Sequence, residues 1–233
     1  MKKLGIIITA YQSERFLLDA INSLKNQTLP VEWKIQFFIG VDGCIECYRI
    51  LKENSITFFY SQRNVGTYIL TNSLLEKSQK ENCDMFLRFD SDDIATENFL
   101  YYGIQHAEKK EFVRNFLMFT DEYLNPIDRK VHRGVGSVFF TRYVLNNLGG
   151  YKHYRVGCDN DFRRRSEKIN LKGIVRSNKP LFLRRKHNKS LTGNANTGHN
   201  SKYRNEIENL MQKERAFTNK VKLTPKTAIL SYE

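Results

Sequence analysis

Three carboxylates stand within the four-residue run Asp-Ser-Asp-Asp at 90–93, directly after the apolar run 85–89. Carboxylates this close repel one another unless a cation offsets their charge. Mg²⁺ and Mn²⁺ prefer oxygen ligands and bridge to diphosphates. The run therefore predicts a divalent-metal site at the end of a strand. A second interpretation is that Ser91 or an aspartate caps the N-terminus of a helix starting near residue 94.

Polar residues also follow two other strand-like runs. Tyr11 comes after the run 4–9, and Asp42 comes after the run 35–41. The carboxyl ends of parallel strands meet at one edge of a doubly wound sheet, where ligands bind. We therefore expect Tyr11, Asp42 and Asp90 to converge on one site from three distant parts of the sequence.

The pattern of apolar residues predicts the elements that position these side chains. Short runs rich in branched and aromatic residues predict buried parallel strands, and apolar stripes that repeat every three or four residues predict helices. In the first half of the chain the expected strands are 4–9, 35–41, 56–60 and 85–89, and the expected helices are 16–24, 68–75 and 99–107. This alternation predicts an α/β fold with a doubly wound, mostly parallel sheet and helices on both faces.

The second half of the chain is less regular. The expected strands are 117–119 and 137–140, and the expected helices are 142–148 and 161–168. An amphipathic helical stripe runs from Lys202 to Val221. We expect a single domain over residues 1–192, with a C-terminal loop and amphipathic helix, 193–233, packed on it.

Seven short motifs follow one another along the chain. Four lie in the first half, at 6–11 (Ile-Ile-Ile-Thr-Ala-Tyr), 41–43 (Val-Asp-Gly), 64–66 (Asn-Val-Gly) and 90–93. Three lie in the second half, at 149–151 (Gly-Gly-Tyr), 158–162 (Cys-Asp-Asn-Asp-Phe) and 185–192. In this order they resemble the motifs of family-2 glycosyltransferases with the GT-A fold. The resemblance covers residues 4–192 and implies a nucleotide-sugar-binding half, 1–93, followed by an acceptor half, 94–192.

The resemblance implies a donor site for a nucleotide sugar, with a UDP-sugar as the expected donor. Tyr11 would stack on the base of the donor, and Asp42 would accept a hydrogen bond from that base. Asp90 would lie at the ribose. Asn64 and Gly66, from the third motif, would belong to the same donor-binding half.

The resemblance also implies a metal site for Mn²⁺ or Mg²⁺. Asp92 would bind the ion that bridges the two phosphates, with Asp93 in support. His187 would complete the metal or diphosphate site. A surface histidine in a basic loop remains the alternative interpretation of His187.

Asp159 matches the catalytic base of the family. A sugar hydroxyl is a poor nucleophile until a carboxylate takes its proton during attack on the anomeric carbon, and in-line displacement would invert that centre. The metal would offset the charge that builds on the departing nucleoside diphosphate. Asp161 is a second candidate for the base, or else it holds Arg165 or another cation. A purely structural role for Asp159 also stays open.

Two departures from the family's pattern weaken any prediction of donor preference. Val41 stands where the family often has the first of two aspartates, and Cys158 stands where it has a glutamate. The Gln-x-x-Arg-Trp motif of processive synthases is missing, because the sole tryptophan is Trp33. We therefore expect transfer of a single hexose or pentose.

The formal net charge of +13 predicts a polyanionic partner unless it reflects only a composition rich in lysine. An acceptor on a glycan or a lipid-linked glycan suits peripheral contact with an anionic membrane face. The alternative is a DNA or RNA glycosyltransferase that modifies a hydroxylated base, with the basic segment 163–189 neutralising phosphates.

Other classes of protein are disfavoured by features that the sequence lacks. No apolar run is long enough to cross a bilayer or to form the core of a signal peptide, so a cytoplasmic protein is expected. The segment after the first strand lacks the glycine-rich loops of dehydrogenases and nucleotidylyltransferases. Cys44 and Cys47 form a lone C-x-x-C without a second pair, so reduced thiols are expected rather than a zinc site.

Overall fold

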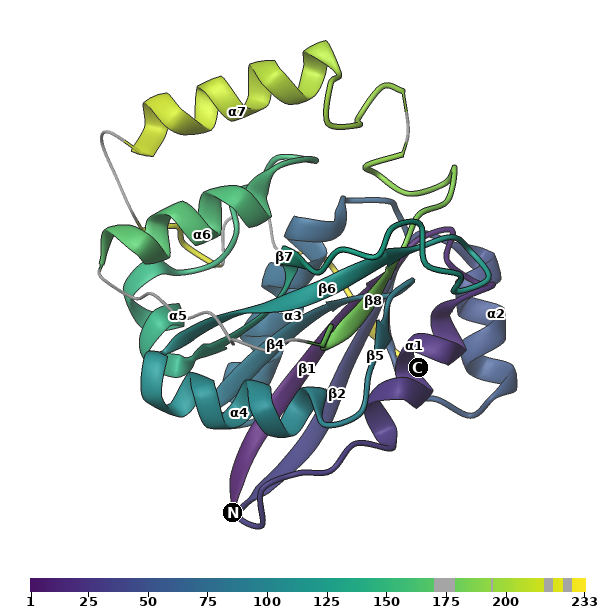
Figure 1. Cartoon of the computed structure of the whole chain (residues 1–233), viewed down its shortest axis with the longest axis vertical. Coiled ribbons are helices and arrows are strands. Elements are labelled where there is room, and N and C mark those ends of the chain that lie inside the picture. Colours follow the sequence, from purple (N-terminus) through teal and green to yellow (C-terminus); the bar gives the residue numbers. More distant parts are fainter. Residues whose placement is uncertain (170–178, 194, 216–219, 224–227) are drawn as a thin grey trace.

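Four parallel strands form the centre of the sheet and account for the strand-like runs in the first half of the sequence (Figure 1). They span Lys2–Ala10 (β1), Trp33–Asp42 (β2), Phe59–Ser61 (β3) and Met85–Asp90 (β4). β1 lies between β2 and β4, and β3 pairs with β2. The structure is a computed structural model that describes residues 1–169, 179–193, 195–215, 220–223 and 228–233.

The remaining described strands extend the same sheet at both edges. They span Ile94–Ala95 (β5), Phe112–Thr120 (β6), His132–Thr141 (β7), Phe182–Arg185 (β8) and Ser231–Tyr232 (β9). The strand order is β5-β8-β6-β7-β4-β1-β2-β3-β9. β7 is antiparallel to both β4 and β6, and β8 is parallel to β6. The carboxyl ends of β4, β6 and β8 therefore lie at the same edge as those of β1 and β2.

Helices cover both faces of the sheet because successive residues of a strand face opposite sides. Leu4, Ile6 and Ile8 pack with one set of helices, α1 (Leu17–Lys25), α2 (Ile45–Glu53) and α4 (Phe99–Lys110). Ile7 packs with the other set, α3 (Thr67–Lys80), α5 (Arg142–Leu148), α6 (Cys158–Lys168) and α7 (Lys202–Arg215). The predicted fold class, a doubly wound and mostly parallel sheet with helices on both faces, is confirmed.

At three places the structure differs from what the sequence indicated. The acid cluster caps no helix, because Ile94 and Ala95 pair with β8 and the next helix begins only at Phe99. Helix α2 was not expected, since only Cys47 and Leu51 of its residues are buried and its apolar stripe is short. The C-terminal helix ends at Arg215 within the described part of the chain, and the predicted stripe's residue 217 lies outside it.

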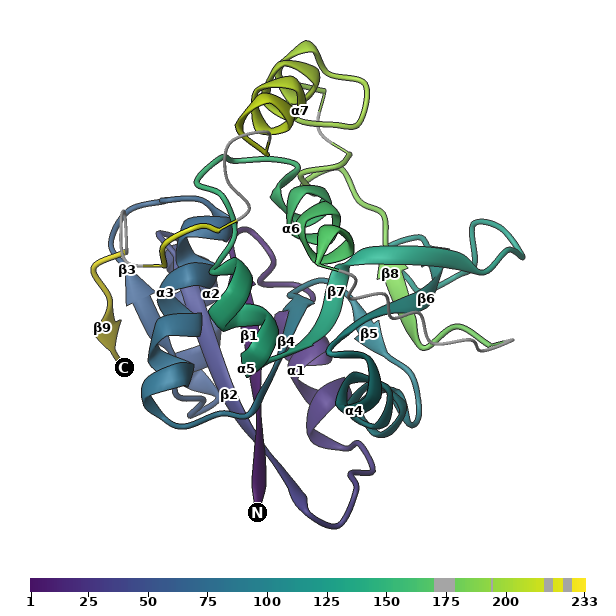
Figure 2. The same cartoon turned by 90° about the vertical axis from the view of Figure 1, so that its left-hand side faces the viewer.

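The described C-terminal residues lie against the rest of the fold. Helix α7 lies beside α6, at the end of the molecule opposite the N-terminus (Figures 1 and 2). Met211 is buried, and its carbonyl accepts a hydrogen bond of 3.1 Å from Lys152 Nζ, which also pairs with Glu214 at 2.7 Å. The last described strand, β9, pairs with β3 and forms the edge of the sheet farthest from β5. Among the described residues, no helix is both long and apolar enough to span a membrane.

Candidate functional site

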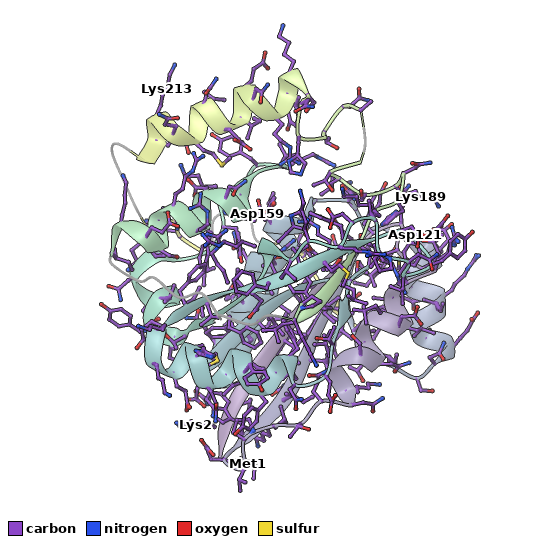
Figure 3. All side chains as sticks on the ribbon, viewed as in Figure 1. Met1, Lys2, Asp121, Asp159, Lys189 and Lys213 are labelled. Atoms are coloured by element: carbon purple, nitrogen blue, oxygen red, sulfur yellow. The ribbon has the colours of Figure 1, made fainter. Side chains whose placement is uncertain are left out.

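A cavity of ≈ 290 Å³ lies at the carboxyl ends of the central strands, where the sequence predicted a site. Figure 3 shows Asp159 between Lys213 of α7 and the end of the molecule that holds Met1 and Lys2, where β1 begins. The predicted residues that line the cavity are Tyr11, Asp42, Asn64, Gly66, Asp90, Asp92, Asp159 and His187. A larger cavity of ≈ 650 Å³ beside the first half of β2 is lined by none of them.

Asp42 organises the loop that forms one wall of the cavity. Its two carboxylate oxygens accept hydrogen bonds from the backbone N–H groups of Val65 (2.7 Å) and Gly66 (2.9 Å). Burial raises the pKa of Asp42, and the two backbone donors oppose that shift. The Asn64 amide donates to the Asp42 carbonyl at 3.4 Å. The motifs at 41–43 and 64–66 are therefore one structural unit, in which Gly66 adopts a positive φ of 97° at the start of α3.

The loop between β1 and α1 forms a second wall. Tyr11 is 47% exposed, so an aromatic face is free for stacking. Two residues later, Ser13 is buried, and its hydroxyl accepts a hydrogen bond of 2.9 Å from Ser91 of the acid cluster. The loop that carries the aromatic ring is thus joined through Ser91 to the segment that carries the carboxylates after β4.

Two members of the acid cluster face the cavity with different partners. Asp90 pairs with the buried Arg88 guanidinium, with 2.8 Å between Oδ1 and Nη2. Asp92 Oδ2 lies 2.9 Å from His187 Nε2, which comes from the segment after β8. The His187 side chain is only 9% exposed and packs on Phe16, with 4.9 Å between the ring centroids. His187 is therefore a part of the cavity wall and not a freely exposed surface histidine.

The Asp92 and His187 pair fits a divalent metal. A carboxylate oxygen and an imidazole nitrogen together suit a first-row ion such as Mn²⁺ better than Mg²⁺, which takes oxygen ligands almost alone. The two side chains come from positions 95 residues apart, so only the folded chain brings them together.

Asp93 does not join this group, although the sequence placed it among the metal ligands. The residue is 1% exposed and is not part of the cavity lining. Burial raises its pKa well above the usual range, and the neighbouring charges of Asp92 and Asp90 raise it further.

Asp159 lies in the first turn of α6 and reaches the cavity. Its Oδ1 accepts a hydrogen bond of 3.1 Å from the hydroxyl of Tyr68. Tyr68 is buried, stacks on Tyr151 with 5.6 Å between the centroids, and lies beneath the Arg88 guanidinium. A rigid aromatic group therefore orients the Asp159 carboxylate from behind.

Asp161 does not line the cavity, and it meets Arg165, the partner named in the second of its two predicted roles. Its side chain is fully buried and accepts a hydrogen bond of 2.7 Å from Arg165 Nε. Arg165 also donates to the carbonyls of Leu148 (2.9 Å) and Gly150 (2.7 Å). The pair thus pins α6 to the end of α5, and Asp161 is placed to hold Arg165 rather than to act as the base.

The described cations of the basic segment 163–189 lie in different places. Arg184 and Arg185 line the cavity, whereas Arg163 pairs with Glu167 at 2.6 Å. Arg185 is 5% exposed, and Nε and Nη1 of its guanidinium are buried with no hydrogen-bond partner among the described residues. These nitrogens suit an anionic ligand. Two further cations of the segment, at positions 172 and 176, lie outside the described residues.

Several residues of the site were missed at the level of sequence. Arg88 had a signal, since a charged residue inside the apolar run 85–89 needs a buried partner. No comparable signal marked the other cavity residues, which reach the site from separate loops and from α3 and α7: Tyr68, Arg155, His199 and Arg204.

Residues 5–166 match the sequence profile of Glycosyl transferase family 2. No curated protein sequence matches at a significant level. The fold is similar to that of S. aureus TarS 1–349 in complex with UDP, with a TM-score of 0.62 and 15% identity over 81% of this chain and 61% of that one. This chain therefore spans about three fifths of TarS 1–349.

Two other solved structures share the fold at low identity. GalNAc-T7 with UDP, GalNAc and Mn²⁺ has a TM-score of 0.61 and 12% identity, over 80% of this chain and 44% of that one. The mannosyltransferase PcManGT from Pyrobaculum calidifontis with GDP-Man and Mn²⁺ has a TM-score of 0.54 and 10% identity, over 78% and 56%. These similarities confirm the expected GT-A fold.

The buried ion pair allows the two aspartates of α6 to be distinguished by stability. Asp161→Asn should lower the free energy of unfolding by about 3–5 kcal/mol, because it leaves the buried Arg165 charge without its carboxylate. Asp159→Asn is the matched control and should change it by about 0.5 kcal/mol or less, as for partly exposed sites. Urea denaturation followed by circular dichroism measures both values. Equal losses in the two variants would contradict the structural role of Asp161.

Proposed function

Because this chain belongs to glycosyl transferase family 2, we propose that it transfers a single sugar from a UDP-sugar to an acceptor hydroxyl, with inversion at the anomeric carbon. The observation that carries the proposal is the convergence on one cavity of an aromatic face, a metal-ligand pair and a separate carboxylate: Tyr11, Asp92 with His187, and Asp159. These are the groups that a nucleotide-sugar donor and an attacking hydroxyl require.

The walls of the cavity supply a site for each part of the donor. Tyr11 offers its exposed ring to the base, and Asp42 keeps lone pairs free to accept from the base while its oxygens hold the 64–66 loop. Arg184 and Arg185 bring positive charge to the diphosphate. UDP is favoured over other nucleotides because UDP is bound in the similar structures of TarS and GalNAc-T7, although PcManGT holds GDP-Man.

Asp92 and His187 would hold Mn²⁺, or Mg²⁺ as the weaker match, and Asp90 would remain paired with Arg88 beside them. The ion when bound would offset charge on the departing nucleoside diphosphate. The arginines at the cavity would act on the same charge, and Nε and Nη1 of Arg185 are buried without a hydrogen-bond partner among the described residues.

Asp159 acts as the general base in this proposal. The hydroxyl of Tyr68 occupies Oδ1 of the carboxylate, so Oδ2 is left to take the proton of the acceptor hydroxyl. The bond from that hydroxyl oxygen to the anomeric carbon forms as the bond to the diphosphate oxygen breaks. Attack opposite the leaving group inverts the anomeric centre.

The acceptor is proposed to be a glycan or a lipid-linked glycan. The net charge of +13 favours an anionic setting, either a membrane face or a polynucleotide. The same net charge makes a hydroxylated base in DNA or RNA the second candidate for the acceptor. The direct test is a product assay of several nucleotide sugars against glycan and polynucleotide acceptors. If no sugar is transferred and no donor is hydrolysed in any of these reactions, the enzyme proposal is wrong.

Asp92→Asn should abolish metal-dependent turnover and leave the fold intact, because it removes the charged ligand of the ion. The matched control is Asp93→Asn, which alters the buried neighbour outside the cavity and should keep turnover. Donor consumption is measured with added Mn²⁺ and with a chelator. Full activity of Asp92→Asn, or undiminished wild-type activity in the chelator, would rule out the metal.

Asp159→Asn should bind donor normally and transfer sugar roughly 10²–10⁴ times more slowly, the usual loss for a general base. Tyr68→Phe should lower kcat about fivefold, as one hydrogen bond of about 1 kcal/mol implies, with the donor KM unchanged. Titration of donor binding and steady-state kinetics separate the two effects. If Asp159→Asn instead loses donor binding and keeps normal kcat, Asp159 is a binding residue.

The two ends of β8 provide a matched test of the basic segment. Lys186 follows the carboxyl end of β8, on the side of the sheet where the cavity lies. Lys179 precedes the amino end of β8, on the side away from the cavity. Both residues are exposed. Lys186→Glu should therefore weaken binding of a polyanionic acceptor, and Lys179→Glu should not. Binding to duplex DNA, RNA and anionic vesicles is measured across a salt series, in which affinity should fall steeply. If the protein binds none of them near physiological salt, the net charge is better explained by a composition rich in lysine.

A further inference from the structure

A second group of metal-ligating side chains lies behind the wall of the donor cavity. Ligand atoms of Glu14, Cys44 and Cys47 all lie within 4.8 Å of one another. Cys44 is 3% exposed and Cys47 is fully buried. Cys44 is the N-cap of α2 and Cys47 lies in its first turn, whereas Glu14 comes from the loop between β1 and α1.

We propose that Glu14, Cys44 and Cys47 form a zinc site. Two thiolates and a carboxylate are ordinary zinc ligands, and Zn²⁺ takes four in a tetrahedral arrangement. The carboxylate of Glu46 accepts from Cys44 Sγ at 3.4 Å, so this exposed side chain or a water molecule can supply the fourth ligand. The site shares no residue with the Asp92 and His187 pair.

One carboxylate oxygen of Glu14 is free to bind a cation. Its Oε1 lies 3.4 Å from Lys189 Nζ, but its Oε2 is buried with no hydrogen-bond partner among the described residues. A buried carboxylate oxygen without a partner is unfavourable, because it has lost its hydrogen bonds to water. An ion between Oε2 and the two sulfur atoms would satisfy that oxygen.

A metal would bind the two sulfur atoms as thiolates, so zinc binding must displace their protons and affinity should rise with pH. Burial raises the pKa of the Cys47 thiol to about 12, which opposes that loss of a proton. The site is therefore supported by the closeness of the three ligands and by the unpartnered oxygen of Glu14.

A bound ion would hold the donor loop in place. The backbone N–H of Gln12 already donates to Cys44 Sγ at 3.4 Å, and the Ser13 hydroxyl lies 3.9 Å from Cys47 Sγ. Zinc would strengthen this connection between α2 and the loop that carries Tyr11. This consequence rests on the proposed donor site, whereas metal binding itself does not.

The lone C-x-x-C argued against zinc in the sequence because no second pair of ligands stood nearby. The third ligand comes from Glu14, 30 residues before Cys44, and only the adjacency of the β1 and β2 ends brings it close. The other two cysteines, Cys83 and Cys158, are not part of the site. Both are buried in the core cluster on the other face of the sheet from Cys44 and Cys47.

The test is titration of the reduced, full-length protein with Cd²⁺, whose thiolate complexes absorb in the ultraviolet, followed by Zn²⁺ competition. Oxygen and nitrogen ligands at Asp92 and His187 give no such absorbance, so failure of the transferase proposal does not affect the readout. We expect one equivalent of Cd²⁺, lost in Cys44→Ser and Cys47→Ser and bound at least roughly tenfold more weakly by Glu14→Gln.

The matched controls are Cys83→Ser and Cys158→Ser, which should bind Cd²⁺ like the wild type. Circular dichroism melting of each variant shows whether it is folded, and Glu14→Gln keeps both thiols and the shape of the carboxylate. No thiolate absorbance at one equivalent of Cd²⁺ in the wild type would overturn the site. So would full binding by folded Cys44→Ser or by folded Glu14→Gln.

Discussion

The buried guanidinium of Arg88 is the interaction on which the arrangement of the site depends. It pairs with Asp90 at the cavity and donates to the carbonyl of Gly136 at 2.8 Å. It also lies over the ring of Tyr68, whose hydroxyl holds Asp159. A charge buried in a sheet is tolerated only with such partners. Strand β4 thereby connects the carboxylates at its own end to the carboxylate of α6.

The cavity balances opposite charges instead of presenting a single sign. Asp90, Asp92 and Asp159 contribute negative charge, and Arg184 and Arg185 contribute positive charge close by. An anionic diphosphate and a divalent cation can therefore enter together, each meeting groups of opposite sign. Asp93 takes no part, because burial and its acidic neighbours favour the protonated form. The net charge of the chain says little about this balance, since it sums over the whole surface.

The fold was largely predictable because it rests on periodicities that a sequence carries. The strand-like runs fall within β1, β2, β4, β6 and β7, and the helical stripes correspond to α1, α3, α4, α5, α6 and α7. The run 56–60 overlaps β3 at residues 59–60 only. Elements with few buried positions were missed: α2 buries Cys47 and Leu51, and β5 has two residues. Their identity depends on neighbours in space, as the pairing of β5 with β8 shows.

The sequence alone determined which residues end the central strands, because alternation of apolar runs places Tyr11, Asp42 and Asp90 at one edge of a parallel sheet. Only the tertiary structure decided which carboxylates face the cavity. Asp92 reaches it and Asp93 does not, although they are adjacent, and Asp159 reaches it while Asp161 is buried against Arg165. Side-chain direction depends on contacts made by segments far apart in sequence, such as His187 with Asp92. A linear pattern identifies candidate residues, and packing selects among them.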